Sequence, residues 1–346
     1  MKLAMALNYS GDPRDTAAEA ADLERAGIDV GWVAELYSFD AVSILGYLAA
    51  KTETMELGSA ILPIYSRTPT LTAMTAAGLD AVSEGRFILG IGASGPQVIE
   101  GWHGVPYDKP IGRQRELIEI CRKVWRREVV THDGPSYHLP LPEGEGTGLG
   151  KPLKLINHPK RANIPVYIAS LGPKNVEVTA EIAEGWLPVF FHPEKAASVW
   201  GDSLAAGAAK RDPSLPPLEV VAGGTVSICG EAEAAEIRNG ARFMTALYVG
   251  GMGAKGKNFY HEYATRLGYG DVATRIQDLY LAGKKEEATA LVPNQLLDEV
   301  GLIGSHGRIV ERLAPWKEAG KRGEVGSMLL NIANPAILEL FARELL

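Results

Sequence analysis

The sequence predicts a single domain of the (β/α)8 barrel class, and three observations lead to this prediction. Short apolar runs alternate along the chain with longer segments of helical period, as expected for parallel strands joined by helices. Eight such runs occur, and each is almost continuously apolar, which is typical of strands buried on both faces. The chain of 346 residues has the length of one barrel and contains no stretch that resembles a second domain. An open doubly wound sheet would give the same local pattern, but the count of eight favours a closed barrel spanning residues 1–346.

Each predicted strand is too short to be a separate helix and is bounded by polar or turn-forming residues. In chain order, the predicted strands cover residues 3–7, 30–34, 57–61, 87–91, 166–169, 186–191, 220–228 and 327–332. The helices between them are recognised by caps and apolar stripes. Segment 14–27 ends on a glycine that suits a left-handed C-cap, and segment 40–51 starts on an N-cap aspartate before a buried stripe. Further helical stripes cover residues 70–82, 117–125 and 337–345.

Three longer segments interrupt the alternation, at residues 101–111, 132–163 and 248–305. In a barrel, such insertions are elaborated loops at the carboxyl ends of the strands, where the active sites of barrel enzymes lie. The sequence therefore places the functional site at that end. Segment 248–305 is expected to serve either as a lid over the site or as a contact between subunits.

Composition excludes several classes of function. The 35 basic and 42 acidic residues give a net charge of −7, so the chain lacks the basic field that nucleic acid binding needs. No apolar run approaches the roughly 18 residues of a membrane span, and no export signal is recognised at the start, so we expect a cytoplasmic protein. Cys121 and Cys229 lie far apart in apolar segments and are expected to be buried thiols.

The segment 90–95 matches the G-x-G-x-x-G pattern of dinucleotide-binding folds. This match is weak, because it lies on the fourth strand, Pro96 follows the last glycine, and residues 98–104 do not resemble a phosphate-binding helix. A simpler interpretation is that the glycines let a flat ligand approach the backbone closely at the end of a strand.

Candidate acid and base groups follow the predicted strands. They are Glu35, Glu100, His103 and His192, and each also fits an ordinary loop residue. His103 stands out, because Trp102 beside it could shield a cleft. The sequence contains no Ser/His/Asp set and no metal-ligand spacing, which disfavours hydrolysis and metal catalysis. The turn 172–175 opens a helix and fits either an anion site or a plain turn.

Several motifs together resemble the bacterial luciferase-like superfamily of barrels, and within it the oxidoreductases that use the deazaflavin coenzyme F420. The resemblance covers nearly the whole chain. The motifs are Leu57-Gly58-Ser59-Ala60-Ile61-Leu62-Pro63, Arg67-Thr68-Pro69, Gly85-Arg86-Phe87-Ile88-Leu89-Gly90-Ile91-Gly92, Ser94-Gly95-Pro96-Gln97, Glu100-Gly101-Trp102-His103-Gly104, Tyr167-Ile168-Ala169 and Gly172-Pro173.

The resemblance implies a set of coenzyme contacts. It places a non-prolyl cis peptide between Ala60 and Ile61, against the back of the deazaflavin ring, and it makes Glu35 the carboxylate that ends the second strand. Sugar-phosphate dehydrogenases of the family carry an acid where this chain has Gly95 and Pro96, so a sugar-phosphate substrate is not implied. The residues expected to bind the coenzyme are Ser59, Ala60, Ile61, Ala93, Ser94 and Gly95, with Gly172, Pro173, Lys174 and Asn175 around its phosphate.

The resemblance implies hydride transfer between coenzyme F420 and a small organic substrate, in a homodimer. Glu35, Tyr37, Glu100 and His103 are expected to line the substrate side, with His103 or Glu35 as the proton donor or acceptor. Methylenetetrahydromethanopterin reduction and secondary-alcohol oxidation are both reactions of the family, and no feature of this sequence selects either one. Two other functions remain: an FMN-dependent monooxygenase, and a barrel that binds flavin or deazaflavin without catalysis.

Overall fold

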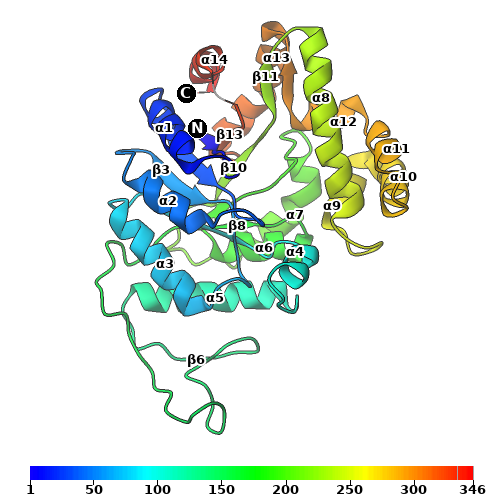
Figure 1. Cartoon of the computed structure of the whole chain (residues 1–346). Helices are drawn as coiled ribbons and strands as arrows, with labels where there is room; N and C mark the ends of the chain where they lie inside the picture. Colours follow the sequence, from blue (N-terminus) through cyan, green and yellow to red (C-terminus); the bar gives the residue numbers. More distant parts are fainter. Residues whose placement is uncertain (333, 346) are drawn as a thin grey trace. The chain divides into compact units, whose positions relative to one another are not determined.

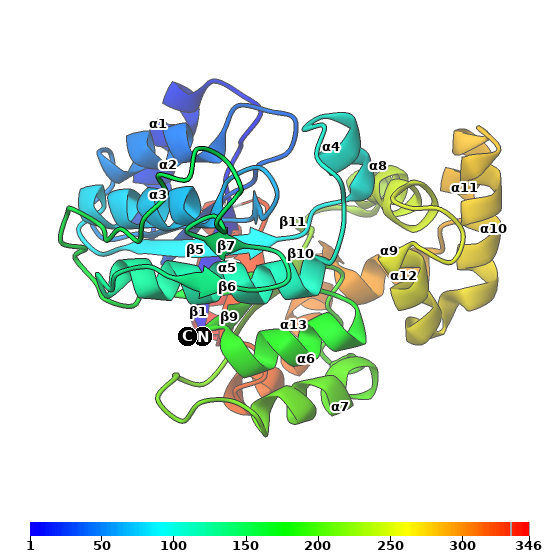
Figure 2. The same cartoon turned by 90° about the horizontal axis from the view of Figure 1, so that it is seen from below.

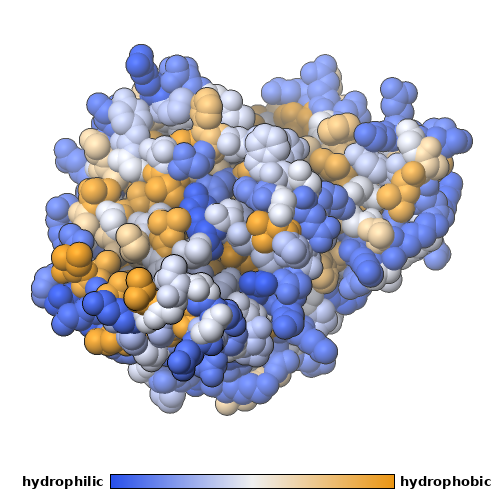
Figure 3. Space-filling model, turned by 60° about the horizontal axis from the view of Figure 1, so that its bottom comes forward, coloured by the Kyte–Doolittle hydropathy of each residue, from blue (hydrophilic) through white to orange (hydrophobic). Residues whose placement is uncertain are grey.

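The computed structural model describes residues 1–332 and 334–345. The chain forms two compact units. The N-unit contains Leu7–Ala169 and Ile182–Gly185, and the C-unit contains Met1–Ala6, Ser170–Glu181 and Trp186–Leu346. In the described part of the chain, no helix combines the length and apolar character needed to cross a membrane. On the face drawn in Figure 3, apolar residues lie in separate patches among hydrophilic ones.

Strands and helices alternate in the N-unit in the predicted order (Figure 1). The strands are β2 (Val30–Val33), β3 (Glu56–Ser59), β4 (Leu62–Pro63), β5 (Phe87–Gly92), β6 (His132–Asp133), β7 (His138–Leu139) and β8 (Val166–Ala169). The helices are α1 (Pro13–Arg25), α2 (Ala41–Ala49), α3 (Pro69–Val82), α4 (Pro96–Gly101) and α5 (Pro110–Trp125). Successive helices α2, α3 and α5 lie side by side (Figure 1).

Five N-unit strands pair in parallel, β2 with β3, β3 with β5, and β5 with both β4 and β8, whereas β6 and β7 form a separate antiparallel pair. Parallel pairing requires a crossover after each strand, and the helices provide it. The sequence also sets the helix starts. Asp40 caps α2, as predicted, because its carboxylate accepts the Ser43 N–H at 2.9 Å. Glycine ends α1 as predicted, since Gly27 has a φ of 92°.

The C-unit contains the remaining elements. Its strands are β1 (Lys2–Ala6), β10 (Glu219–Gly224), β11 (Val226–Ile228), β12 (Leu302–Gly304) and β13 (Ser327–Leu330), and β9 (Gly185–Trp186) lies where the two units join in sequence. Its helices are α6 (Pro173–Ile182), α7 (Ala196–Ala208), α8 (Glu231–Ala246), α9 (Phe259–Ala264), α10 (Gly270–Leu281), α11 (Lys285–Ala290), α12 (Asn294–Val300), α13 (His306–Lys321) and α14 (Pro335–Leu345), with π-helices η1 (Leu247–Gly251) and η2 (Thr265–Tyr269). Strand β13 pairs in parallel with β1 and β10.

Segment 248–305 is largely helical and has its own small core, formed by residues such as Val249, Ile276 and Leu297. Helices α8, α10 and α11 pack around it (Figure 2). Aromatic stacking joins the segment to α7, because the rings of Tyr263 and Trp200 lie 4.7 Å apart, centroid to centroid. The segment is therefore a folded part of the C-unit.

The predicted fold class is confirmed. The largest hydrogen-bonded sheet of the described residues has nine strands. Two of these, β3 and β4, are consecutive pieces of one strand. The sheet therefore has the eight parallel strands of a (β/α)8 barrel. The single domain over residues 1–346 stays a prediction; Leu346 lies outside the described residues.

Two strand predictions were wrong in extent. The strand predicted at 186–191 ends at Trp186, and Phe190, with a φ of 53°, lies in the left-handed region that a strand does not use. The strand predicted at 220–228 is divided into β10 and β11, and β11 pairs with β12 in a separate sheet. At the division, a Cβ on Gly224 would lie 2.2 Å from the Val300 carbonyl oxygen, so the two backbones approach closely there.

Helix α4 begins at Pro96, which occupies the first helical turn, where its missing N–H costs nothing. One further expectation was wrong. Cys121 is buried as predicted, but Cys229 is only half-buried, since it follows β11 near the surface.

The interior of the N-unit is filled by aromatic rings that require glycines opposite them. Trp32 and Tyr167 are buried with their ring centroids 5.5 Å apart. A Cβ on Gly58 would lie 2.2 Å from the Trp32 ring, and a Cβ on Gly185 would lie 2.3 Å from the Tyr167 ring. Glycine at these two positions is therefore a packing requirement.

Replacing Gly58 by alanine should lower the free energy of unfolding by about 2 kcal/mol or more, because Trp32 has no room to move in a packed interior. Guanidinium chloride denaturation measures this loss. Gly78→Ala is the matched control: Gly78 lies on the exposed side of α3 with open space around it, so alanine should raise stability by about 0.5–1 kcal/mol. Equal stabilities of the two variants would contradict the packing described.

Candidate active site

Glu35, directly after β2, is held by a buried ion pair with Arg67, which precedes α3. The Arg67 guanidinium donates to both carboxylate oxygens, at 2.6 Å to Oε1 and 2.9 Å to Oε2. Oε2 also accepts the backbone N–H of Ala41 at 2.9 Å, at the start of α2. The Glu35 carboxylate is only 7% exposed. This arrangement ties together the loops that follow β2 and β4, and it uses both oxygens as acceptors.

The end of β3 is joined to β5 through a side chain. The hydroxyl of Ser59 donates to the Gly90 carbonyl oxygen at 2.8 Å and accepts the Gly90 N–H at 3.0 Å. Ser59 is fully buried, so this hydroxyl is occupied within the protein. Just after Ser59, the peptide bond between Ala60 and Ile61 is cis. A Cβ on Gly92 would lie 3.2 Å from Ile61 Cγ1, which places the chain after β3 beside the end of β5.

The loop after β5 folds back on itself through Tyr107. The Tyr107 hydroxyl donates to the Ser94 carbonyl oxygen at 3.4 Å, and its backbone N–H donates to Glu100 Oε1 at 3.2 Å. Ser94 has a φ of 57°, in the left-handed region. The Tyr107 ring packs on that of Tyr65, and burial raises the pKa of both phenols. Sequence reasoning missed both tyrosines, because no motif marks a tyrosine that braces a loop.

His103 follows α4 and carries the one feature of this loop that the fold leaves unexplained. Its Nε2 atom is buried and has no hydrogen-bond partner. Buried polar atoms are almost always paired, so the unpaired imidazole nitrogen makes His103 a candidate for a ligand contact or a catalytic role. Trp102, beside His103 in the sequence, is 66% exposed. Its ring lies 6.4 Å from that of Tyr37, centroid to centroid.

Among the predicted site residues, Tyr37 reaches the second loop through Trp102, and this ring contact joins the loops after β2 and β5. Glu100 lies in the last turn of α4. The Ala93–Gly95 segment follows β5 directly. Ser59, in contrast, is turned into the sheet.

The predicted anion turn belongs to the C-unit. Gly172 lies at the start of α6, and its carbonyl oxygen accepts the N–H of Asn175 at 3.0 Å. Lys174 is exposed in the first turn, where helix N–H groups lack helical partners. A side chain from segment 248–305 covers this turn, because Arg266 donates to the Leu171 carbonyl oxygen at 3.1 Å. Pro173 has no N–H, and the Asn175 and Val176 N–H groups donate to the Gly172 carbonyl oxygen, so the turn offers an anion mainly the positive charge of Lys174.

His192 is placed in a structural cluster. Its Nδ1 accepts the Glu194 N–H at 3.2 Å, and its Nε2 lies 3.8 Å from the Glu299 carboxylate. Burial lowers the pKa of His192. Lys195 pairs with Glu299 at 2.8 Å and holds its pKa below the usual value. These contacts join α12 to the loop before α7.

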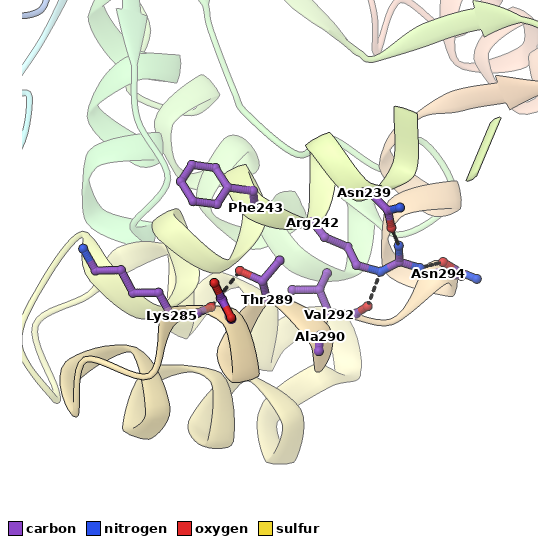
Figure 4. Close-up of a pocket in the computed structure, with 9 residues that line it drawn as sticks. Asn239, Arg242, Phe243, Lys285, Thr289, Ala290, Val292 and Asn294 are labelled. Carbon is purple, nitrogen blue, oxygen red and sulfur yellow. Dashed lines mark hydrogen bonds between the residues drawn. The ribbon is translucent and has the colours of Figure 1, made fainter. Parts of the chain in front are cut away.

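A separate cavity of about 540 Å³ lies between α8 and the segment from α11 to α12 (Figure 4). Arg242 points across it and donates to the Asn239 carboxamide and the Val292 carbonyl oxygen, so its guanidinium is held within the protein. None of the predicted site residues lines it. Among the described residues, no group of three or more His, Cys, Asp or Glu side chains has the arrangement of a metal site.

Comparison with known proteins agrees with this fold. A family model described as luciferase-like monooxygenase matches residues 1–323. The chain is 42% identical to a Mycobacterium tuberculosis protein provisionally named a coenzyme F420-dependent oxidoreductase, over 92% of this chain and 93% of that one. It is 28% identical to a 5,10-methylenetetrahydromethanopterin reductase of Archaeoglobus fulgidus, over 93% and 92%. The solved coenzyme F420-dependent tetrahydromethanopterin reductase of Methanopyrus kandleri has the same fold, with a TM-score of 0.78 at 20% identity over 99% and 98% of the chains.

Removing the Glu35 carboxylate should destabilise the protein strongly. Glu35→Ala leaves Arg67, 14% exposed, without its partner, and we expect the free energy of unfolding to fall by about 3–5 kcal/mol. The double variant Glu35→Met/Arg67→Met should lose less free energy of unfolding than the variants Glu35→Met and Arg67→Met lose together. Glu128→Ala, which removes an exposed ion pair with Arg126, should change stability by less than about 1 kcal/mol. Denaturant unfolding measures the stability of each variant. If Glu35→Ala loses no more free energy of unfolding than Glu128→Ala, the buried ion pair does not have the structural role described.

Proposed function

Because the chain belongs to the luciferase-like monooxygenase family, we propose that it is an oxidoreductase that uses coenzyme F420 and exchanges a hydride with a small organic substrate. The main structural support for the location of the site is the Nε2 atom of His103, which is buried and has no hydrogen-bond partner. The long match to a relative named as F420-dependent supports the choice of coenzyme. Coenzyme F420, when bound, supplies or accepts the hydride, and the protein supplies position and proton transfer.

The residues present fit such a group. Gly92 has no side chain, which lets Ile61 and Ala169 approach the carboxyl end of β5 closely, since a Cβ there would lie 3.2 Å from Ile61 Cγ1 and 3.3 Å from the Ala169 Cβ. The buried, unpaired Nε2 of His103 belongs to the proposed substrate side. We propose that Ala60, Ile61 and the Ala93–Gly95 segment contact the coenzyme ring through backbone and apolar atoms. Ser59 would act indirectly in this arrangement, since its hydroxyl holds Gly90.

The first turn of α6 is the proposed site for the coenzyme's phosphate. Backbone N–H groups of a helix N-terminus favour an anion, and Lys174 adds a positive charge there. Gly172, Pro173 and Asn175 complete the turn. Arg266 and Phe259 of segment 248–305 lie against it, which favours a covering role for this segment over a subunit contact.

On the substrate side, His103 is the better candidate for the proton donor or acceptor. Glu35 already accepts hydrogen bonds from Arg67 and Ala41, so a proton on its carboxylate would displace one of them. We propose that Glu35 fixes the loop of Tyr37 and that Glu100 fixes the loop of His103 through Tyr107. A homodimer in the cytoplasm completes the proposal and can be tested by light scattering and by cell fractionation.

Substituting His103 by alanine should lower turnover about 10²- to 10⁴-fold, as expected for loss of a general acid or base. Affinity for coenzyme F420 should stay within a few-fold, because the imidazole acts on the substrate. Stopped-flow absorbance of the coenzyme and equilibrium titration measure the two quantities. His306→Ala, at an exposed position that starts α13, is the control and should retain full turnover. Unchanged turnover in His103→Ala, with thermal unfolding as in the unsubstituted protein, would refute the role.

A further inference from the structure

We infer that the cavity between α8 and the segment from α11 to α12 binds a small organic carboxylate with an apolar body. This cavity, called the α8–α11 cavity below, lies wholly within the C-unit. Its volume of about 540 Å³ is within the range of small-molecule sites, about 300–1,000 Å³. It shares no lining residue with the first turn of α6 or with the candidate active site, so the inference is independent of the proposed function.

Arg242 places a fixed positive charge in the α8–α11 cavity (Figure 4). Its guanidinium donates to the Val292 carbonyl oxygen at 3.2 Å and to the carboxamide oxygens of Asn239, at 2.5 Å, and Asn294. All three acceptors are neutral, and Arg242 forms no ion pair within the described part of the chain. The half-buried guanidinium is therefore held in place without a counter-ion, which a bound carboxylate would supply.

The contacts of Arg242 leave hydrogen-bond donors available. A guanidinium has five N–H groups, and the three contacts use three of them. Because a guanidinium cannot accept, Asn239 and Asn294 turn their oxygens toward it and keep their NH2 groups for other acceptors. Among the residues that the structure describes, neither NH2 group has an acceptor. The two oxygens of a carboxylate match this excess of donors.

The charges on the cavity lining favour one anionic group. Lys285, exposed on α11, is a second cation, and its ammonium lies 5.6 Å from the centroid of the Tyr280 ring. Glu286 is the one carboxylate among the described residues that line the cavity. Two cations against one carboxylate leave a net positive charge, which attracts a single carboxylate and repels a cation.

Phe243 gives the cavity an apolar wall. Its ring is 53% exposed, on the face of α8 that also carries Asn239 and Arg242. Val292 and Ala290, from the other side of the cavity, add further apolar surface. An apolar ring exposed beside a fixed cation suits a ligand whose carboxylate reaches Arg242 while its body packs on Phe243.

Three ligands of one shape test the predicted charge: 2-naphthoate, 2-naphthamide and 2-naphthamidinium. Isothermal titration calorimetry of the full chain at low ionic strength measures their binding. We expect 2-naphthoate to bind at least about tenfold more tightly than the other two, because it alone provides Arg242 with a counter-ion. Added salt should weaken the binding of 2-naphthoate more than that of 2-naphthamide. Equal binding of the three, or preferred binding of the amidinium, would overturn the inference.

Variants of the lining residues test the contacts. Arg242→Gln should weaken 2-naphthoate binding about tenfold or more. Phe243→Ser should weaken it about 3- to 10-fold, and the exposed position of Phe243 protects this variant from unfolding. Thermal unfolding checks that each variant is folded. Full affinity in both folded variants would place the ligand outside the cavity and overturn the inference.

Two neighbouring lysines provide a matched pair of charge variants. Lys285→Gln should weaken 2-naphthoate binding about two- to fourfold, because this exposed ammonium acts through a screened charge. Lys284 lies outside the cavity lining and pairs with Glu287 at 3.2 Å, so Lys284→Gln should leave the affinity within about 1.5-fold. Equal losses in the two variants would show a general attraction to positive charge and would contradict a defined site.

Hydrogen exchange locates the ligand independently of substitutions. A ligand between α8 and α11 joins two helices that pack on the small core of segment 248–305. Saturating 2-naphthoate should therefore slow backbone exchange in Lys285–Ala290 at least about threefold and leave Ala41–Ala49 of the N-unit unchanged. Protection of other segments alone would overturn the inference.

Competition with the coenzyme separates this inference from the proposed function. We expect saturating coenzyme F420 to leave 2-naphthoate binding unchanged, since the two sites share no residue. Displacement of 2-naphthoate by coenzyme F420 would assign the anion site to the coenzyme and overturn the inference. If 2-naphthoate binds as described but coenzyme F420 does not bind, the α8–α11 cavity stands and the proposed function fails.

Discussion

The buried ion pair between Glu35 and Arg67 is the constraint on which the candidate site depends. It joins the loops after β2 and β4, and through the Ala41 N–H it also sets where α2 begins. The aromatic side chains of Tyr37 and Phe39 lie between these fixed points. Without the pair, an arginine and a carboxylate would be left buried alone, which is costly enough to keep this geometry intact. The candidate site is therefore positioned by a buried ion pair.

Aromatic packing plays the corresponding part beneath the site and in the C-unit. In the N-unit, Trp32 and Tyr167 fill the interior opposite glycines on neighbouring strands. In the C-unit, Trp200 stacks on Tyr263 and so fixes segment 248–305 to α7. Both clusters leave the loops at the strand ends free to vary in chemistry, as is usual for barrels.

Much of the fold was predictable, because apolar runs and helix caps are local signals. As the sequence predicts, Asp40 begins helix α2 and Gly27 ends helix α1. The division at Gly224 was not predictable, since it depends on the distant Val300 carbonyl. Motifs made the residue types of the candidate site predictable. Its contacts were not predictable, because no local sequence pattern links Glu35 to Arg67 or Tyr107 to Ser94. The exposure of Trp102 also depends on tertiary structure alone.

The most direct test of the central claim is a comparison of coenzymes. The purified protein is titrated separately with coenzyme F420 and with FMN, and calorimetry or coenzyme fluorescence follows the binding. The account predicts saturable micromolar binding of coenzyme F420 and at least about tenfold weaker binding of FMN. Preferred binding of FMN would contradict it and would make oxygen-dependent chemistry the function of this site.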